Sequence, residues 1–195
     1  MGIDVSKLRV EPAIYDFLPG SLIPDPRSPI PSCPVVLGLG SNQGDSRRIV
    51  LDAATALQQV LAELNMASLY ETSPLYVTDQ GSFINTAVVG LYSGTARELL
   101  YRIHEIEARF GRDRQKERRW GERSLDIDIL LFGNLTLNEN DLQIPHARLK
   151  ERRFALEPLL ELLPNAVEPG TGLSYRSICD ALPDQEVKKI RNAEL

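Results

Sequence analysis

The sequence predicts an α+β domain with a ferredoxin-like core and a mainly antiparallel sheet. Between residues 35 and 132 the hydrophobic spacing follows the order strand, helix, strand, strand, helix, strand, which is the split βαβ pattern. The two middle strands follow one another with no helix between them, so they form a hairpin instead of a parallel crossover. A chain of 195 residues, 43% of them hydrophobic, buries enough surface to fold without disulfides or a structural metal.

The first 34 residues differ in composition from the rest of the chain. Seven of the thirteen prolines lie between Pro12 and Pro34, and a segment so rich in proline sustains neither a helix nor a central strand. We therefore expect an extended or partly disordered N-terminal arm over residues 1–34, followed by one folded domain over residues 35–195.

The first half of the domain is predicted from apolar periodicity and turn residues. A helix capped by Asp45 or Ser46 follows the first strand, and its apolar positions keep helical spacing from Ile49 to Leu64. The other predicted elements are a buried strand at 35–40, a turn at 41–44, a strand at 66–72, a loop at 73–82 and a strand at 83–92.

The second half begins with a clear helix signal. Thr95 and Glu98 have the spacing of a capping box, and the helix that they open stops at Gly111. The later elements are a strand at 124–132, a turn at 133–134, a corner at Pro145 and His146, a helix near 154–162 and an amphipathic segment at 175–182.

Composition excludes several classes of site and location. Cys33 and Cys179 are the only cysteines and His104 and His146 the only histidines, which rules out a disulfide framework, a four-ligand zinc site and a His-rich site. No apolar run reaches the length of a membrane span and no signal peptide is evident, so we expect a cytoplasmic protein. The net charge of -5 argues against nucleic acid or a membrane as partner.

The charge is nevertheless very uneven along the chain. Seven basic and three acidic residues lie between Arg109 and Arg123, and a second basic group lies between Arg148 and Arg153. These two groups flank Asp126 and Asp128, which share one face of a strand because they are two residues apart. Two adjacent carboxylates repel each other unless a cation lies between them, and magnesium accepts one or two carboxylates plus phosphate oxygens. The pattern favours a site for metal-bound polyphosphate over a solvated strand face.

Two other motifs carry less information. The sequence from Gly38 to Gly44 invites a dinucleotide-binding interpretation, but Gln43 replaces the third glycine and no acidic residue follows at the right distance, so we favour a tight strand-to-helix turn. Trp120, within the basic loop, favours an exposed ring that stacks on a flat ligand. By default Phe83 and Phe154 are core residues, and Glu107 is a charge on a helix surface.

Taken together, these residues resemble a known family. The twelve residues from Arg119 to Leu130 resemble the signature of the 6-hydroxymethyl-7,8-dihydropterin pyrophosphokinases (2-amino-4-hydroxy-6-hydroxymethyldihydropteridine diphosphokinases), which act in folate biosynthesis. Further matches follow in the family's order, at 39–42, 72–75, 83–85 and 144–146, and with Arg152 and Phe154. The resemblance extends from about Val35 to the C-terminus.

The resemblance implies a fold and a reaction. The fold is a three-layer α/β/α arrangement around the ferredoxin-like core. The reaction is a magnesium-dependent transfer of pyrophosphate from ATP to 6-hydroxymethyl-7,8-dihydropterin, which makes the chain a kinase-type transferase that binds ATP. The expected partners are these two small molecules. A monomer is expected, and an association with a neighbouring folate-pathway enzyme is left open.

The resemblance also implies roles for individual residues. Asp126 and Asp128 bind two Mg²⁺ ions, and together with Arg114 and Arg123 they form the catalytic group. Phe83 and Phe154 stack on the pterin ring and Asn85 binds its polar edge. The remaining pterin-side residues are Thr72, Ser73, Leu75 and Trp120, and the ATP-binding residues are Glu107, Arg112, Arg114, Trp120, Arg123, Ile129, His146 and Arg152.

Several positions depart from the commonest form of the family. Phe83 stands where many members have a tyrosine, and Ala147 follows His146 where a tyrosine is frequent. Asp141 occupies a position that can be basic, and Gln115 replaces a possible lysine in a loop that is about one residue longer. These departures affect single ATP contacts and leave the reaction unchanged.

Two alternative functions remain open from the residues alone. Ferredoxin-like domains often bind RNA on their sheet, and the basic loop could hold phosphates. Against this, the predicted sheet lacks paired exposed aromatic residues, and the two aspartates would repel a nucleic-acid backbone. The other alternative is a metal-dependent nucleotidyltransferase that releases pyrophosphate.

Overall fold

A computed structural model describes residues 32–74, 79–112 and 122–190. The N-terminal arm, apart from its last residues, and the middle of the basic loop therefore lie outside the described residues. The elements are, in order, β1 (Cys33–Ser41), α1 (Ser46–Leu57), β2 (Ala62–Met66), β3 (Tyr70–Thr72), β4 (Phe83–Tyr92), α2 (Ala96–Arg109), β5 (Asp126–Phe132), β6 (Leu137–Asn138), β7 (Gln143–Ile144), a 3₁₀ turn (Leu149–Glu151), α3 (Arg153–Leu162), α4 (Tyr175–Ala181) and β8 (Val187–Lys189).

The central sheet has the strand order of a ferredoxin-like fold. Its strands follow the order β5, β1, β4, β3, β8, with β2 also paired to β4, and every pair is antiparallel. The last core strand therefore lies beside the first, and the two halves of the split second strand lie on the far side of β4. This order confirms the predicted core and the mainly antiparallel sheet.

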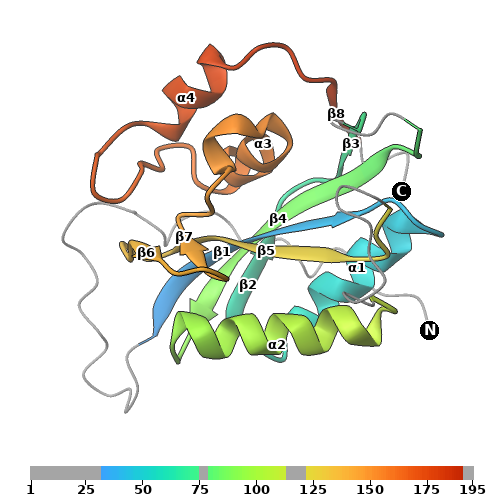
Figure 1. Ribbon diagram of the computed structural model, residues 1–195, viewed down its shortest axis with the longest axis horizontal. Helices are drawn as coiled ribbons and strands as arrows, with labels where there is room; N and C mark the ends of the chain where they lie inside the picture. Colours follow the sequence, from blue (N-terminus) through green and yellow to red (C-terminus); the bar gives the residue numbers. More distant parts are fainter. Residues whose placement is uncertain (1–31, 75–78, 113–121, 191–195) are drawn as a thin grey trace.

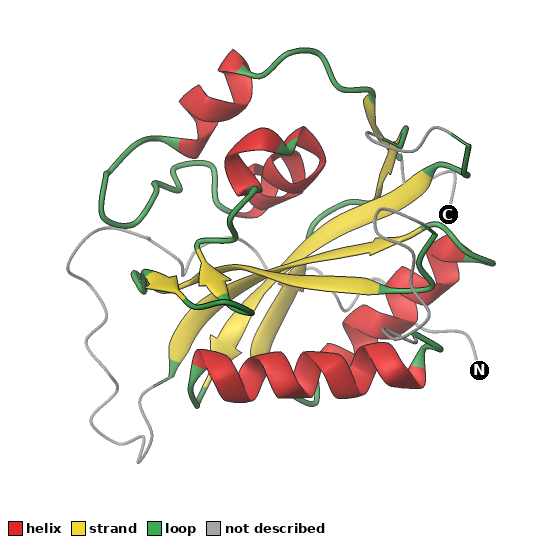
Figure 2. Ribbon diagram, in the orientation of Figure 1, coloured by secondary structure: helices red, strands yellow, loops and turns green. Residues whose placement is uncertain are grey.

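The helices form a layer on each face of the sheet (Figures 1 and 2). α1 and α2 cover one face, where Leu37 and Leu99 are fully buried in the larger apolar cluster. α3 and α4 cover the other face, where Leu156 and Tyr175 are fully buried in a second cluster. The three-layer arrangement follows because each face of the sheet is apolar and needs its own cover.

The structure corrects the predicted boundary between the first helix and the second strand. α1 ends at Leu57, and β2 already begins at Ala62. Leu61 and Leu64 still pack against the same apolar cluster as the helix, so a tight turn followed by a strand buries the side chains that helical spacing would bury. The predicted strand at 66–72 is likewise divided into the end of β2 and the separate strand β3.

The glycines of this region lie where the sequence predicts them. Gly38 and Gly40 lie inside β1, and Gly44, which has φ +63°, lies in the turn before α1. The two-residue strands β6 and β7 and the three-residue strand β8 were not predicted, because such short segments show no hydrophobic period.

Other local predictions agree closely with the structure. The third predicted strand coincides with β4, and Asp45 caps α1 through a bond from the Arg48 N–H. The corner at Pro145 contains a cis peptide bond with Ile144. Within the described parts of the chain, no helix combines the length and the apolarity needed to cross a membrane.

The capping box at the start of α2 yields a stability prediction. The Thr95 side chain accepts a bond from the Glu98 N–H, and the Glu98 carboxylate accepts one from the Thr95 N–H at 2.8 Å. Thr95→Ala should cost about 1 kcal/mol and lower Tm by roughly 2–4 °C, because the Glu98 N–H loses its side-chain acceptor. Thermal unfolding measures this, with the exposed Thr136→Ala as the control; equal Tm values in the two variants would contradict the role of the cap.

Candidate active site

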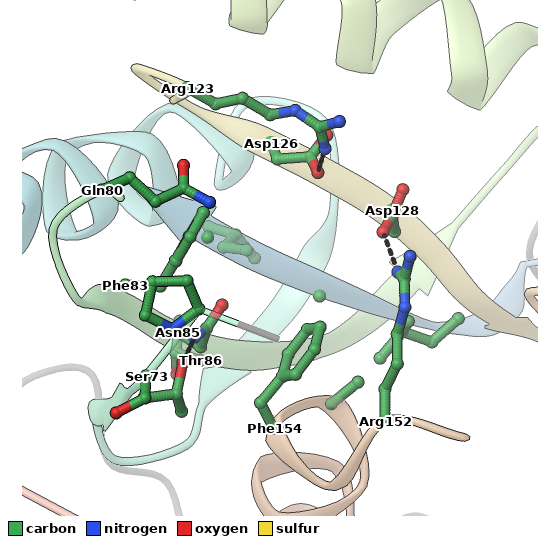
Figure 3. A pocket seen from close by; sticks show the side chains of 17 residues that line it. Ser73, Gln80, Phe83, Asn85, Thr86, Arg123, Asp126, Asp128, Arg152 and Phe154 are labelled. Atoms are coloured by element: carbon green, nitrogen blue, oxygen red, sulfur yellow. Dashed lines mark hydrogen bonds and ion pairs between the residues drawn. The ribbon is translucent and has the colours of Figure 1, made fainter. Parts of the chain in front are cut away.

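One pocket opens between the sheet and the start of α3 (Figure 3). β1, β4 and β5 form its floor, the β3 end and the following loop form one wall, and α3 forms the other. The lining residues are Gly38, Leu39, Gly40, Thr72, Ser73, Pro74, Gln80, Phe83, Asn85, Thr86, Arg123, Asp126, Asp128, Leu130, Arg152, Phe154 and Ala155.

Two carboxylates project from β5 into this pocket. Asp126 and Asp128 lie on the α3 side of the sheet, while Ile127 and Ile129 between and beyond them are buried in the core under α1 and α2. This alternation is the two-residue period of a strand. Leu130, two residues further along, lines the pocket on the same face, and a bulge in the pairing of β1 and β5 places Leu131 in the same α3-side apolar cluster as Leu130.

Glycines opposite the carboxylates keep the floor of the pocket open. Gly40 pairs with Asp126 and Gly38 with Asp128 across the two strands. A side-chain Cβ at Gly40 would lie 2.8 Å from Asn85 Oδ1, and one at Gly38 would lie 3.3 Å from methyl groups of Leu130. Only residues without a side chain therefore allow Asn85 and the carboxylates to reach the same space.

Asp126 is held by two guanidinium groups. Arg112 and Arg123 each form an ion pair with one of its carboxylate oxygens. Glu107 binds the same Arg112 group from behind and also accepts a bond from the Ile127 N–H at 2.9 Å. Its side chain is only 1% exposed, so the interpretation of Glu107 as a helix-surface charge is wrong. Glu107 instead ties the end of α2 to β5.

Asp128 has more distant partners than Asp126. Arg152 Nη1 lies 3.4 Å and His146 Nε2 lies 3.6 Å from one of its oxygens. His146 Nδ1 accepts a bond from the Arg148 N–H at 3.2 Å, which leaves the ring proton on Nε2, directed to Asp128. The side chain of Asp128 is 35% exposed toward the pocket, against 23% for Asp126.

These surroundings shift the two carboxyl pKa values in opposite directions. Burial alone would raise the pKa of Asp126, but the positive charges of Arg123 and Arg112 hold it below its usual value. Burial and the negative charge of Asp126 raise the pKa of Asp128, and the nearby His146 and Arg152 only partly oppose this. Burial also lowers the pKa of His146, which is therefore neutral near pH 7. Asp128 is the carboxylate that gains most from an additional cation.

Aromatic and amide side chains form the other end of the pocket. Phe154 extends from the start of α3, and Phe83 and Asn85 extend from β4 (Figure 3). The Asn85 amide donates to Thr72 Oγ1 at 2.8 Å, which fixes its plane and leaves Oδ1 beside Gly40. Arg152 lies over the Phe154 ring, with its guanidinium carbon 5.6 Å from the ring centre. A flat, polar heteroaromatic ligand fits this combination of stacking surfaces and hydrogen-bonding groups.

The chain was compared with protein-family models and with curated proteins. Residues 36–164 match the model of 7,8-dihydro-6-hydroxymethylpterin-pyrophosphokinase (HPPK). The chain belongs to the HPPK family. It is 38% identical over 136 residues to the 2-amino-4-hydroxy-6-hydroxymethyldihydropteridine pyrophosphokinase of Aquifex aeolicus, covering 69% of this chain and 83% of the relative. The Bacillus subtilis protein of the same name is 40% identical over 128 residues, with 65% and 75% covered.

Longer relatives and solved structures agree with this family assignment. The Folic acid synthesis protein fol1 of Pneumocystis carinii is 34% identical over 157 residues, which are 80% of this chain and 21% of that protein. The crystal structure of wild-type Plasmodium falciparum HPPK-DHPS with pteroate superposes with a TM-score of 0.62 at 17% identity, covering 78% of this chain and 45% of that chain. The chain thus spans only a part of several relatives, and the structural match supports the HPPK fold.

The structure brings many, but not all, of the residues predicted from the HPPK resemblance into the pocket. Those that line it are Thr72, Ser73, Phe83, Asn85, Arg123, Asp126, Asp128, Arg152 and Phe154. Glu107, Arg112 and His146 lie behind the carboxylates, and the Ile129 side chain packs in the core on the opposite face of the sheet. Leu75, Arg114 and Trp120 lie outside the described residues, as does Gln115. Asp141 pairs with Arg97 at the surface.

Two residues that join the loops of the HPPK site were not predicted as site residues. Asn42 Oδ1 accepts a bond from the Arg123 N–H at 2.7 Å, and Asn42 Nδ2 donates to Gln80 Oε1 at 3.1 Å. Asn42 therefore connects the end of the basic loop to the loop before β4. It belongs to the 39–42 match with the family, which was the available signal; Gln80 gave none.

The donor set at β5 fits magnesium. In the described part of the chain, no three His, Cys, Asp or Glu side chains cluster as a metal site, so a metal at Asp126 and Asp128 needs further oxygen ligands from water or substrate. That is the coordination that Mg²⁺ prefers, because it retains waters and binds substrate phosphates. Because burial and Asp126 raise the pKa of Asp128, a cation bound beside it would favour its ionised form.

The opposite pKa shifts predict opposite effects of two isosteric substitutions. Ionised Asp126 stabilises the fold above its unfolded-state pKa, so Asp126→Asn should lower Tm at pH 7. Because its pKa is raised in the folded state, Asp128 contributes to the stability of the fold only at low pH, where it is protonated. This contribution is lost as the pH rises through the folded-state pKa. Asp128→Asn should therefore raise Tm at pH 7.

Thermal unfolding at pH 7 in the presence of a chelator and without nucleotide measures both effects. Asp180→Asn, at an exposed position on α4, serves as the control and should leave Tm unchanged. A lower Tm for Asp128→Asn would contradict the interpretation of Asp128 as the under-compensated charge.

Proposed function

We propose that residues 35–195 form a diphosphotransferase domain that transfers pyrophosphate from ATP to 6-hydroxymethyl-7,8-dihydropterin, giving AMP and the pterin diphosphate in tetrahydrofolate biosynthesis. One observation carries the proposal. In this HPPK-family chain, a pair of carboxylates lies at one end of a pocket, and aromatic side chains with a fixed amide lie at the other end of the same pocket. The carboxylates suit a metal-bound polyphosphate, and the aromatic end suits a pterin.

The aromatic end of the pocket would bind and orient the pterin. Phe83 and Phe154 offer two ring faces for stacking, which gains apolar contact without restricting which way the ligand points. Asn85, Thr72 and Ser73 add donors and acceptors near the ring edge, and these set the orientation. A site built from such groups rejects ring analogues that lack matching donors, since its buried polar atoms would then lose their partners.

The cationic end would bind the phosphates of ATP. Arg123 and Arg152 line the pocket beside the carboxylates, and Arg112 lies directly behind Asp126. Two magnesium ions at Asp126 and Asp128 would neutralise phosphate charge during transfer. The proposal also includes the other roles that the family resemblance implies. Arg114 and Trp120 would contact the substrates and Leu75 would lie beside the pterin. Glu107, His146 and Ile129 would lie around ATP.

The reaction needs alignment more than a protein nucleophile. The pterin hydroxymethyl oxygen attacks the β-phosphorus of ATP, a new O–P bond forms, and the bond between the β-phosphorus and the oxygen bridging to the α-phosphate breaks, releasing AMP. The protein contributes by holding the attacking oxygen in line and by spreading positive charge along the phosphates. Among the described residues that line the pocket, no serine–histidine or cysteine–histidine pair is present to supply such a nucleophile.

The names of relatives suggest partners for the proposed enzyme. Relatives from Arabidopsis thaliana and Pisum sativum are named folate synthesis bifunctional proteins, and both names include the word mitochondrial. We propose that this chain likewise works beside a second folate-synthesis enzyme. A monomeric state and a cytoplasmic location are retained as expectations.

Product analysis tests the proposed reaction directly. Purified protein with Mg²⁺ and ATP should form AMP only when 6-hydroxymethyl-7,8-dihydropterin is added, in a one-to-one ratio with the pterin diphosphate. Chromatography of nucleotides and pterins separates all of these species. Release of pyrophosphate would instead indicate a nucleotidyltransferase, and the absence of turnover would leave the binding-module alternative.

Removal of either carboxylate should abolish the proposed reaction while the fold is retained. Asp126→Ala and Asp128→Ala should each lower kcat by about 10³-fold or more, because charge stabilisation at the transferred group is lost. Circular dichroism should show a folded protein, and Asp180→Ala on α4 should keep full activity. An unfolded Asp128→Ala protein would assign that residue a structural role instead.

A further inference from the structure

The C-terminal segment Gln185–Ile190 lies beside the pocket although it follows the region that matches the family model, residues 36–164. Figure 1 shows the chain passing from α4 to the edge of the sheet, where β8 pairs with β3. Val187 is opposite Thr72, and the Ile190 N–H donates to the Leu69 carbonyl at 2.8 Å. The segment is therefore an ordered part of the described fold.

Gln185 forms hydrogen bonds with the backbone on both sides of the pocket residue Arg152. Its Oε1 accepts a bond from the Arg153 N–H at 2.9 Å, and its Nε2 donates to the Glu151 carbonyl at 2.9 Å. The donor and the acceptor together fix the orientation of the amide. Helix α3 has no side-chain cap from its own N-cap residue, Arg152, so Gln185 caps this helix from a distant part of the chain.

The residue bracketed by these two bonds is central to the pocket. The Arg152 guanidinium lies 3.4 Å from Asp128 and over the Phe154 ring. Both Arg152 and Phe154 line the pocket (Figure 3). The N-terminus of α3 sets the direction in which both side chains leave the backbone, and the Gln185 amide is bonded to the backbone at that point.

The next residue holds the opposite wall. Glu186 Oε2 accepts a bond from Ser73 Oγ at 2.6 Å, and Ser73 lines the pocket on the β3 side. Two consecutive residues of the segment thus contact the two walls, one through α3 and one through the loop after β3. The segment therefore bridges the two walls of the pocket.

We propose that Gln185 is a positioning residue for Arg152 and Phe154, and that the segment Gln185–Ile190 sets the width of the pterin end of the pocket. This inference rests on the proposed function and adds to it the residue that orients the α3 wall. Gln185 does not line the pocket itself, so its effect on substrate is exerted through the backbone of Glu151 and Arg153.

Substitutions at Gln185 separate positioning from a merely structural role. Gln185→Ala removes both bonds and should raise KM for the pterin by about tenfold, since small misplacements of binding groups are costly. Gln185→Glu keeps an acceptor for the Arg153 N–H but places a carboxylate against the Glu151 carbonyl, so its KM should lie between those of Gln185→Ala and the wild type. The neighbouring Asp184→Ala, at an exposed position, should match the wild type.

The decisive comparison is KM against Tm. A lower Tm with an unchanged pterin KM in both Gln185 variants would overturn the inference, because it would show support of the fold alone. If Gln185→Ala does not fold, the pterin KM of Gln185→Glu, compared with that of the wild type, still tests the inference.

A second readout separates this inference from the proposed function. If the wild-type protein is inactive, the proposed function fails, and amide exchange with NMR then tests the positioning. In either Gln185 variant that folds, the Phe154 ring resonances should shift, and in Gln185→Ala the Arg153 N–H should also exchange faster. Unchanged resonances and exchange would overturn the inference whatever the activity.

Discussion

The placement of two like charges on one face of β5 is the constraint on which the rest of the site depends. The proposed binding of metal-bound phosphate requires Asp126 and Asp128 to be adjacent, and adjacency makes both costly to ionise in a partly buried pocket. The fold brings cations to them from several elements: Arg112 from the end of α2, Arg123 from the end of the basic loop, and Arg152 from the start of α3. The electrostatics of one strand thus connects helices on both faces of the sheet.

Nearby positive charges compensate the two carboxylates unequally, and this difference bears on the proposed function. Asp126 has two close guanidinium partners and a lowered pKa, whereas Asp128 has only more distant partners and a raised pKa. In the proposed function, a metal ion bound with phosphate would stabilise ionised Asp128 more than ionised Asp126. The overall charge of -5 hides this local group of cationic side chains around the two carboxylates.

Local chemistry made much of the fold and site predictable. The two-residue spacing of the aspartates, the capping box at Thr95 and the hairpin between the middle strands each follow from short-range rules. Contacts between distant segments of the chain do not follow from such rules. Gly38 and Gly40 have the same spacing as the aspartates, but only the register of β1 with β5 shows that they lie opposite. The amide of Gln185 acts across the fold in the same way, and nothing around it in the sequence indicates this.

Calorimetric titration of Mg²⁺ into the protein with a non-hydrolysable ATP analogue tests the central claim most directly. The account predicts that two Mg²⁺ ions bind per chain with the nucleotide, and that adding the pterin afterwards gives a further binding heat. It also predicts that Asp128→Ala weakens binding of the magnesium nucleotide by at least about tenfold, because the metal loses a carboxylate ligand. Equal affinity of Asp128→Ala and the wild type for the magnesium nucleotide would contradict the claim that the β5 carboxylates hold the metal.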